Sequence, residues 1–126
     1  MNPVDAGKLG LEDGDVVRVY NERGSVLGGM YVNERIMPGA VYQDHGARVD
    51  PIVTGKCGLD RGGANNLICP TATTSKNAAG EATNGFLVNV EKVDVFSLAE
   101  EYPEQFGREY DPSDGLRVSA WLVDGQ

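Results

Sequence analysis

The chain has 126 residues, enough for one domain with a modest hydrophobic core. Its net charge is −8 at pH 7, so it lacks the basic surface that a nucleic-acid-binding protein normally shows. No apolar run approaches the roughly 20 residues needed to span a bilayer, so membrane insertion is not expected. Its seventeen glycines, about twice the usual share of roughly 7%, favour a mainly β domain with many tight turns.

The acidic residues are concentrated toward the C-terminus. Residues 1–90 carry ten acidic and eight basic side chains, whereas residues 91–126 carry nine and three. We therefore expect the tail to form a solvated surface or a contact with other protein. The two cysteines, Cys57 and Cys69, form no C-x-x-C pair and have no histidine pattern nearby, so no metal site is expected.

The N-terminal third predicts a short helix followed by a β-hairpin. Asn2 can cap a helix that has Pro3 in its first turn and ends at Gly10. The β-branched and aromatic run at 16–21 predicts a strand, and a returning strand is predicted at 26–32. The intervening E-R-G-S is expected to close this hairpin as a tight turn.

Further strands are predicted at 40–43 and 86–95. Between them, residues 59–85 form a polar stretch with almost no hydrophobic periodicity. After the last of these strands, apolar residues at i, i+4 spacing predict one short helix or two turns, because Pro103 interrupts the pattern. The final segment, 117–126, predicts a short strand or an extended arm.

The polar stretch is too long to be an idle turn, since connections beyond ~12–15 residues are usually functional or disordered. It contains two adjacent asparagines, several glycines and hydroxyl side chains, and one lysine. These groups offer hydrogen-bond donors and acceptors to a polar ligand. Without such a ligand, we expect residues 71–83 to be mobile.

Four segments in a fixed order carry a resemblance to a known family. They are NPVDAGKLGLEDGDVVRVYNERGSV, RIMPGAVYQDHGA, GGANNLI and FLVNVEKV. Together they resemble the molybdopterin-dinucleotide-binding domain, which is the C-terminal domain of the dimethyl-sulfoxide-reductase family of molybdenum and tungsten oxidoreductases. Several spaced motifs in one order are more specific than any single motif. The resemblance covers residues 1–93 and leaves residues 94–126 outside it.

The resemblance implies a mainly β fold, a double-psi β-barrel of about six strands with short helices, over residues 1–93. The first strand could be missing, because the family domain is preceded by a strand and a loop that this chain lacks. The chain is accordingly expected to be an excised C-terminal domain of a larger enzyme. Residues 94–126 would form an acidic C-terminal extension that packs on the barrel or on the rest of the parent enzyme.

The resemblance also implies a cofactor. The parent enzyme is expected to hold a molybdopterin guanine dinucleotide, as a bis-MGD pair around molybdenum or tungsten, which the isolated chain would lack. The residues expected to bind this cofactor are His45, Gly46, Asn65, Asn66, Thr74, Lys76 and Asn77. No catalytic residue and no metal ligand is expected, since the resemblance places the metal ligand in an earlier domain. The expected partners are the other domains of the parent, and an iron–sulfur subunit could be a further one.

The residue types suit such a ligand, but each also has a plainer interpretation. Asparagine offers both an acceptor and a donor to a heterocycle edge, and lysine offers one compact positive charge. However, Asn65 and Asn66 could simply form a turn, His45 could be a structural hydrogen-bonding residue, and Lys76 could be a solvated surface lysine. Arg23 is expected to help close the hairpin rather than touch a ligand.

Two other classes of function stay open at this point. Double-psi barrels also serve as protein-interaction modules without a cofactor, in which case the acidic tail and Trp121 would dock a partner chain. A small barrel-type decarboxylase would need a self-processing Gly-Ser pair, and Gly24 and Ser25 form one. No nucleophile, base and orienting group occur together, so stand-alone catalysis is not expected.

Overall fold

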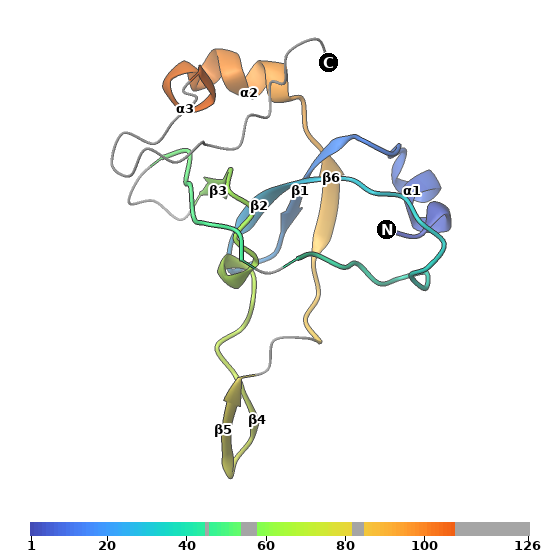
Figure 1. Ribbon diagram of the computed structural model, residues 1–126, viewed down its shortest axis with the longest axis vertical. Helices are drawn as coiled ribbons and strands as arrows, with labels where there is room; N and C mark the ends of the chain where they lie inside the picture. The colour runs from blue at the N-terminus through green and yellow to red at the C-terminus, as the bar shows by residue number, and fades with distance from the viewer. Residues whose placement is uncertain (45, 54–57, 82–84, 108–126) are drawn as a thin grey trace. The chain divides into compact units, whose positions relative to one another are not determined.

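The structure is a computed structural model that describes residues 1–107 except 45, 54–57 and 82–84. The contacts divide the chain into two units, Met1–Lys92 and Val93–Gln126, and the second is described as far as residue 107. The elements in chain order are α1 (Pro3–Leu9), β1 (Val16–Tyr20), β2 (Ser25–Gly29), β3 (Leu59–Asp60), the 3₁₀ turn η1 (Asn65–Leu67), β4 (Thr73–Ser75), β5 (Ala78–Glu81), β6 (Asn89–Lys92), α2 (Val95–Glu101) and α3 (Pro103–Gly107) (Figure 1).

Helix α1 forms as its sequence predicts. The side chain of Asn2 accepts a hydrogen bond of 2.9 Å from the backbone N–H of Val4, and Pro3 occupies the first position. Gly10 ends the helix with φ 67°, in the left-handed region that glycine adopts at little cost. The predicted cap, start and end of this helix are all confirmed.

The main sheet has four strands in the order β3-β2-β1-β6. Strand β1 pairs antiparallel with both neighbours, with Val17 opposite Gly28 of β2 and Lys92 of β6. Strand β3 pairs parallel with β2, where Ser25 lies opposite Leu59. A separate two-stranded sheet, β4-β5, completes the β structure of the described residues (Figure 1). The prediction of a mainly β fold with short helices is confirmed, while closure into a double-psi barrel stays a prediction.

Strand β2 is the buried strand of the sheet. Val26 and Leu27 are 0% and 1% exposed, and as consecutive strand residues they point to opposite faces. Both faces of the sheet are therefore covered at β2. One hydrophobic cluster consists of Ala6, Leu11, Val17 and Met30, with Met1, Val19, Val32 and Val90 packed against it. Helix α1 and the sheet thus share this part of the core.

Two predicted strands are shorter than the sequence suggests. Strand β2 ends at Gly29, because the next residue, Met30, exchanges backbone hydrogen bonds with the turn before β1, donating to Asp15 and accepting from Gly14. The strand predicted at 86–95 is reduced to β6. Its expected C-terminal end belongs to α2 instead, since the Asp94 carboxylate caps that helix by accepting from the N–H groups of its first turn.

The strand predicted at 40–43 is wrong. The segment has the composition of a strand but pairs with no neighbouring strand. Tyr42 is 78% exposed, and the Gln43 side chain donates a hydrogen bond of 3.0 Å to the carbonyl of Gly63. A side-chain hydrogen bond, rather than a ladder, thus joins this segment to the loop after β3.

The described part of the second unit consists of two short helices. Helix α2 ends at Glu101 and is capped by Tyr102, whose N–H donates to the carbonyl of Leu98; α3 begins at Pro103. The predicted interruption at this proline is confirmed, and Phe106 is buried. The arm predicted at 117–126, with Trp121, lies outside the described residues. No helix of the described chain has the length and apolarity required to cross a membrane.

Candidate functional site

Two glycines after β3 allow unusually close packing of the backbone. A Cβ atom on Gly62 would lie 1.9 Å from the carbonyl oxygen of Arg48, a distance that no side chain tolerates. Gly63 has φ 76°, and a Cβ there would lie 3.0 Å from the carbonyl oxygen of Leu27. These glycines therefore serve packing within the chain.

A buried ion network holds the same loop, and the sequence did not indicate it. The Arg61 guanidinium, 1% exposed, donates to the Asp50 carboxylate through Nε at 2.9 Å and also through a second nitrogen. The Asp60 carboxylate accepts from the N–H of Asp50 at 2.6 Å and from that of Ala64 at 2.9 Å. Charge-assisted hydrogen bonds of this kind are stronger than neutral ones, so the backbone leading to η1 is firmly fixed.

The paired asparagines lie in η1, directly after this network. The Asn65 side chain donates a hydrogen bond of 3.4 Å to the carbonyl of Asp44, and Asn66 is exposed. Asp44 immediately precedes His45, which lies outside the described residues. Gly46 follows with φ 96°, a value that favours glycine. The structure thus brings Asn65 beside Asp44, although the two are 21 residues apart in the sequence.

The three residues before His45, which are Tyr42, Gln43 and Asp44, make hydrogen bonds that the sequence did not predict. The Tyr42 hydroxyl donates to the Asp44 carboxylate at 2.6 Å. This hydrogen bond, reinforced by the negative charge of the carboxylate, raises the pKa of Tyr42 above its ordinary value. The Tyr42 bond thus lies within this segment, whereas the Gln43 bond to Gly63 joins the segment to the loop that leads to η1.

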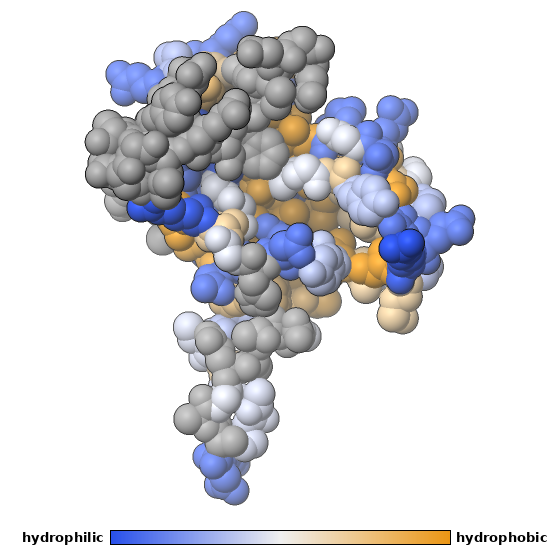
Figure 2. Space-filling model, in the orientation of Figure 1, coloured by the Kyte–Doolittle hydropathy of each residue, from blue (hydrophilic) through white to orange (hydrophobic). Residues whose placement is uncertain are grey.

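The other predicted cofactor residues lie on a separate hairpin. Lys76 and Asn77 form the two-residue turn between β4 and β5, and Thr74 lies in β4. All three are exposed, and the hairpin tip is hydrophilic (Figure 2). Within the described part of the chain, no hydrogen bond joins this hairpin to Asn65 or Asn66. The predicted site is therefore divided into a fixed group at η1 and a second group on the hairpin.

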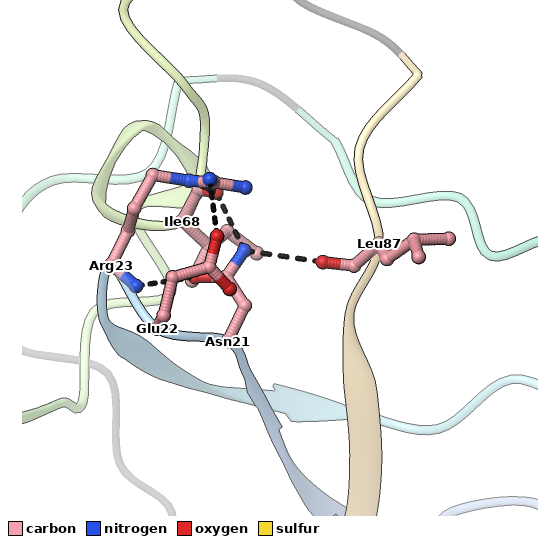
Figure 3. A network of polar contacts seen from close by, with 5 residues as sticks. All are labelled: Asn21, Glu22, Arg23, Ile68 and Leu87. Carbon is pink, nitrogen blue, oxygen red and sulfur yellow. Dashed lines mark hydrogen bonds and ion pairs between the residues drawn. The ribbon is translucent and has the colours of Figure 1, made fainter.

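The turn between β1 and β2 carries contacts beyond hairpin closure (Figure 3). The carbonyl of Ile68 accepts from Nδ2 of Asn21 at 2.8 Å and from Nε of Arg23 at 2.8 Å. Asn21 Nδ2 also donates to the carbonyl of Leu87 at 3.3 Å. Ser25 is buried in the β2 ladder, opposite Tyr20, whereas Gly24 lies in the turn just before the strand and is partly exposed.

An apolar cavity of about 530 Å³ lies on the first unit but does not coincide with the predicted site. Of the segment before His45 it includes Val41, Tyr42 and Gln43, and it is lined elsewhere by residues of the sheet and of the segment that follows β2. Apolar side chains are visible between polar ones over this unit (Figure 2). Apolar residues of its wall include Met1, Val17, Val19, Met30, Val41 and Val90. Its lining suits hydrophobic groups better than the polar edges of a dinucleotide.

The described residues include no group of three or more histidine, cysteine or acidic side chains that could hold a metal ion. What they do present is a pinned loop with exposed amides and a polar hairpin, on a mainly β scaffold.

Comparison with known proteins places the chain in a family. The family model described as "Molydopterin dinucleotide binding domain" matches residues 1–86. The chain therefore belongs to the molybdopterin dinucleotide-binding domain family, and the resemblance read from its motifs is confirmed.

Three relatives show what the chain is similar to: one is named a hydroxytransferase and two are named reductases. The chain is 41% identical over 95 residues to the pyrogallol hydroxytransferase large subunit of Pelobacter acidigallici, covering 75% of this chain and 11% of the relative. It is 41% identical over 93 residues to dimethyl sulfoxide/trimethylamine N-oxide reductase of Cereibacter sphaeroides, covering 73% and 11%. It is likewise 41% identical to dimethyl sulfoxide reductase DmsA of Escherichia coli, covering 74% and 11%. The chain thus spans 11% of the length of each of these relatives.

Proposed function

We propose that this chain is the C-terminal domain of a molybdenum or tungsten oxidoreductase, in which it binds and orients the molybdopterin guanine dinucleotide. The parent enzyme would catalyse oxygen-atom or electron transfer. The observation that carries the proposal is the η1 turn, where the exposed amide of Asn66 sits on backbone fixed by the buried Asp50, Asp60 and Arg61 network. Because this backbone is already fixed, ligand binding needs to order only the Asn66 side chain, which limits the entropy lost.

The side chains fit the chemistry of the ligand. Pterin and guanine rings present amide-like edges, and an asparagine amide can both donate to and accept from such an edge. Asn66 makes no side-chain hydrogen bond to another described residue, so its donors and acceptor face solvent. The positive charge of exposed Lys76 suits a pyrophosphate. When bound, the cofactor supplies the redox chemistry, while the protein binds and tunes it.

The proposed partners follow from the small share of the relatives that the chain covers. The other domains of the parent enzyme would supply the metal ligand and the substrate funnel, and an iron–sulfur subunit is a further proposed partner. In this arrangement the acidic extension at 94–126 contacts the first unit or the rest of the parent.

The test is to measure cofactor content in the parent enzyme carrying Asn66→Ala and Lys76→Ala. Because both side chains are exposed, the double variant should fold normally but retain less molybdenum and release less guanine nucleotide on denaturation. The matched control is Asn89→Ala with Lys8→Ala, which removes an exposed amide and an exposed cation elsewhere. Cofactor content equal to that of the control would contradict the assignment of these two residues.

A further inference from the structure

The turn between β1 and β2 makes more contacts than closing a hairpin requires. Hairpin closure is accounted for by two bonds: Asn21 N–H donates to the Gly24 carbonyl at 3.0 Å, and Arg23 N–H donates to Asn21 Oδ1 at 2.9 Å. The side-chain donors of Asn21 and Arg23 point instead to two other segments, at Ile68 and Leu87 (Figure 3). The turn therefore connects three parts of the chain.

The contact with the η1 side is both polar and steric. The Ile68 carbonyl accepts two hydrogen bonds from the turn, so both of its lone pairs are used. A Cβ atom on Gly24 would lie 2.8 Å from the carbonyl oxygen of Leu67, so only glycine lets η1 approach this closely. Ile68 itself is 3% exposed, which makes an unpaired carbonyl at this position costly.

The contact with the other side holds the chain as it enters β6. Asn21 Nδ2 donates to the Leu87 carbonyl, and the Arg23 guanidinium lies 5.6 Å from the centroid of the Phe86 ring, within range of a cation–π interaction. One side-chain nitrogen thus reaches both ends of the polar segment that contains the β4-β5 hairpin.

We propose that Asn21, Arg23 and Gly24 form a clamp that positions both groups of cofactor-binding residues. The Ile68 end follows the η1 turn with Asn65 and Asn66, and the Leu87 end follows the hairpin with its predicted phosphate-binding lysine. The clamp residues touch no ligand; they act by holding the two ends of the segment together. The role in cofactor binding rests on the proposed function, whereas the clamp itself does not.

The decisive variant is Asn21→Asp, studied in the free chain. Aspartate keeps the Oδ1 acceptor for the N–H of Arg23, so the turn can close, but it loses the Nδ2 donor that reaches Ile68 and Leu87. Amide hydrogen exchange followed by NMR should show faster exchange at Leu67, Ile68 and Cys69, whose N–H groups bond within the η1 turn. We expect an acceleration of about tenfold, which corresponds to ~1.4 kcal/mol of local opening free energy.

The reference amides are those of β1, β2 and α1. If the clamp acts as proposed, the Asn21→Asp variant exchanges these amides within about twofold of the rates in the original chain, because the opening is local rather than global. Glu22→Gln is the matched control: it removes the exposed ion pair to Arg23 at 2.7 Å but leaves the donors to Ile68 in place, so exchange in η1 should not change. Equal acceleration of all amides, or none in η1, would overturn the clamp.

A second variant covers the case in which Asn21→Asp does not fold. Arg23→Gln removes the Nε donor to the Ile68 carbonyl while keeping the backbone bond of the turn, and it should also accelerate exchange in η1 selectively. The cofactor role is tested separately in the parent enzyme, where Asn21→Asp should lower guanine content. Selective exchange with unchanged guanine content would overturn the cofactor role alone. If Asn66→Ala lowers cofactor content but neither clamp variant alters exchange, the clamp fails and the proposed function stands.

Discussion

The residues that fix the candidate site are charged groups in the interior. Asp60 and Arg61 are each 1% exposed, although both residue types are almost never fully buried unless paired. Their partners explain the exception, because Asp50 meets the guanidinium and two N–H groups meet the Asp60 carboxylate. Removing one member leaves the others desolvated without compensation, which costs more than the pair contributes.

Substituting Arg61→Met should therefore destabilise the chain strongly. We expect a loss of about 3 kcal/mol in the free energy of unfolding, the low end for breaking a buried pair, because the Asp50 side chain is 19% exposed. The measurement is chemical denaturation monitored by circular dichroism. Arg18→Met is the control, since its ion pair with Glu91 lies at the surface and should contribute less than about 1 kcal/mol. If the two variants lost similar free energies of unfolding, the burial of the Arg61 ion pair would have no special effect on stability.

At the scale of elements, the parts readable from the sequence are those set by near neighbours. The cap at Asn2, the left-handed Gly10 and the break at Pro103 each depend on a few adjacent residues, and each appears as predicted. The strand predicted at 40–43 failed because a strand also needs a partner, which composition does not supply.

The sequence did not predict the hairpin β4-β5, because its two strands pair although their composition gives no strand signal. Its strands hold small and polar residues, and its turn, Lys76-Asn77, is not among the strong hairpin signals. The candidate site was predictable only in its residue types. The contact of Asn65 with Asp44 joins segments that lie well apart in the sequence, and so does the ion network around Arg61. Neither could be predicted from neighbouring residues.

The outer edge of the sheet carries an ion pair that should give a pH signature. Lys92 in β6 contacts Asp15, just before β1, at 2.8 Å. The hydrogen bond from Lys92 lowers the pKa of Asp15 below 3.8, and the hydrogen bond to Asp15 raises the pKa of Lys92 above 10.5. The stability gained from a lowered acid pKa is present above the pKa of the unfolded chain and is lost as pH falls through the pKa of the folded chain. The stability gained from a raised lysine pKa is present below the pKa of the unfolded chain and is lost as pH rises through the pKa of the folded chain.

The variant Lys92→Met should consequently be less stable than the original chain only at intermediate pH. Between pH 5 and 9, roughly, a small difference in denaturation midpoint is expected, because exposed pairs contribute little. The difference should shrink below pH 3.8, as Asp15 is protonated. Urea denaturation at a series of pH values measures it, and a difference that does not vary with pH would show that the pair has no electrostatic role.

For the molecule as a whole, the family motifs and the described core coincide. The hydrophobic cluster from Ala6 to Met30, its packing partners and every strand among the described residues lie within Met1–Lys92. Order and spacing of motifs made the family recognisable from the sequence because they are properties of a long segment rather than of one site. The role of residues 94–126 stays a prediction, since the motifs do not reach it.

A chain shortened to residues 1–93 should fold by itself. Every strand that the structure describes and the whole hydrophobic cluster are retained, so we expect cooperative unfolding and a β-type circular dichroism spectrum, with a midpoint close to that of the full chain. Its net charge would change from −8 to about −2, which should raise its isoelectric point measurably. Loss of the cooperative transition would mean that the acidic extension is part of the folding unit.

The two hydrogen bonds that Asn21 donates, to the carbonyls of Ile68 and Leu87, have a consequence for protein engineering. Since Asn21 keeps Ile68 and Leu87 within hydrogen-bond reach of a single nitrogen, the segment between them begins and ends at nearly the same place. Its length can therefore change at small entropic cost, because lengthening a loop whose ends are already joined adds only about 0.6 kcal/mol per doubling. The β4-β5 arm is in this sense an interchangeable insert, and a guest peptide grafted there would leave the register of β1, β2 and β6 undisturbed.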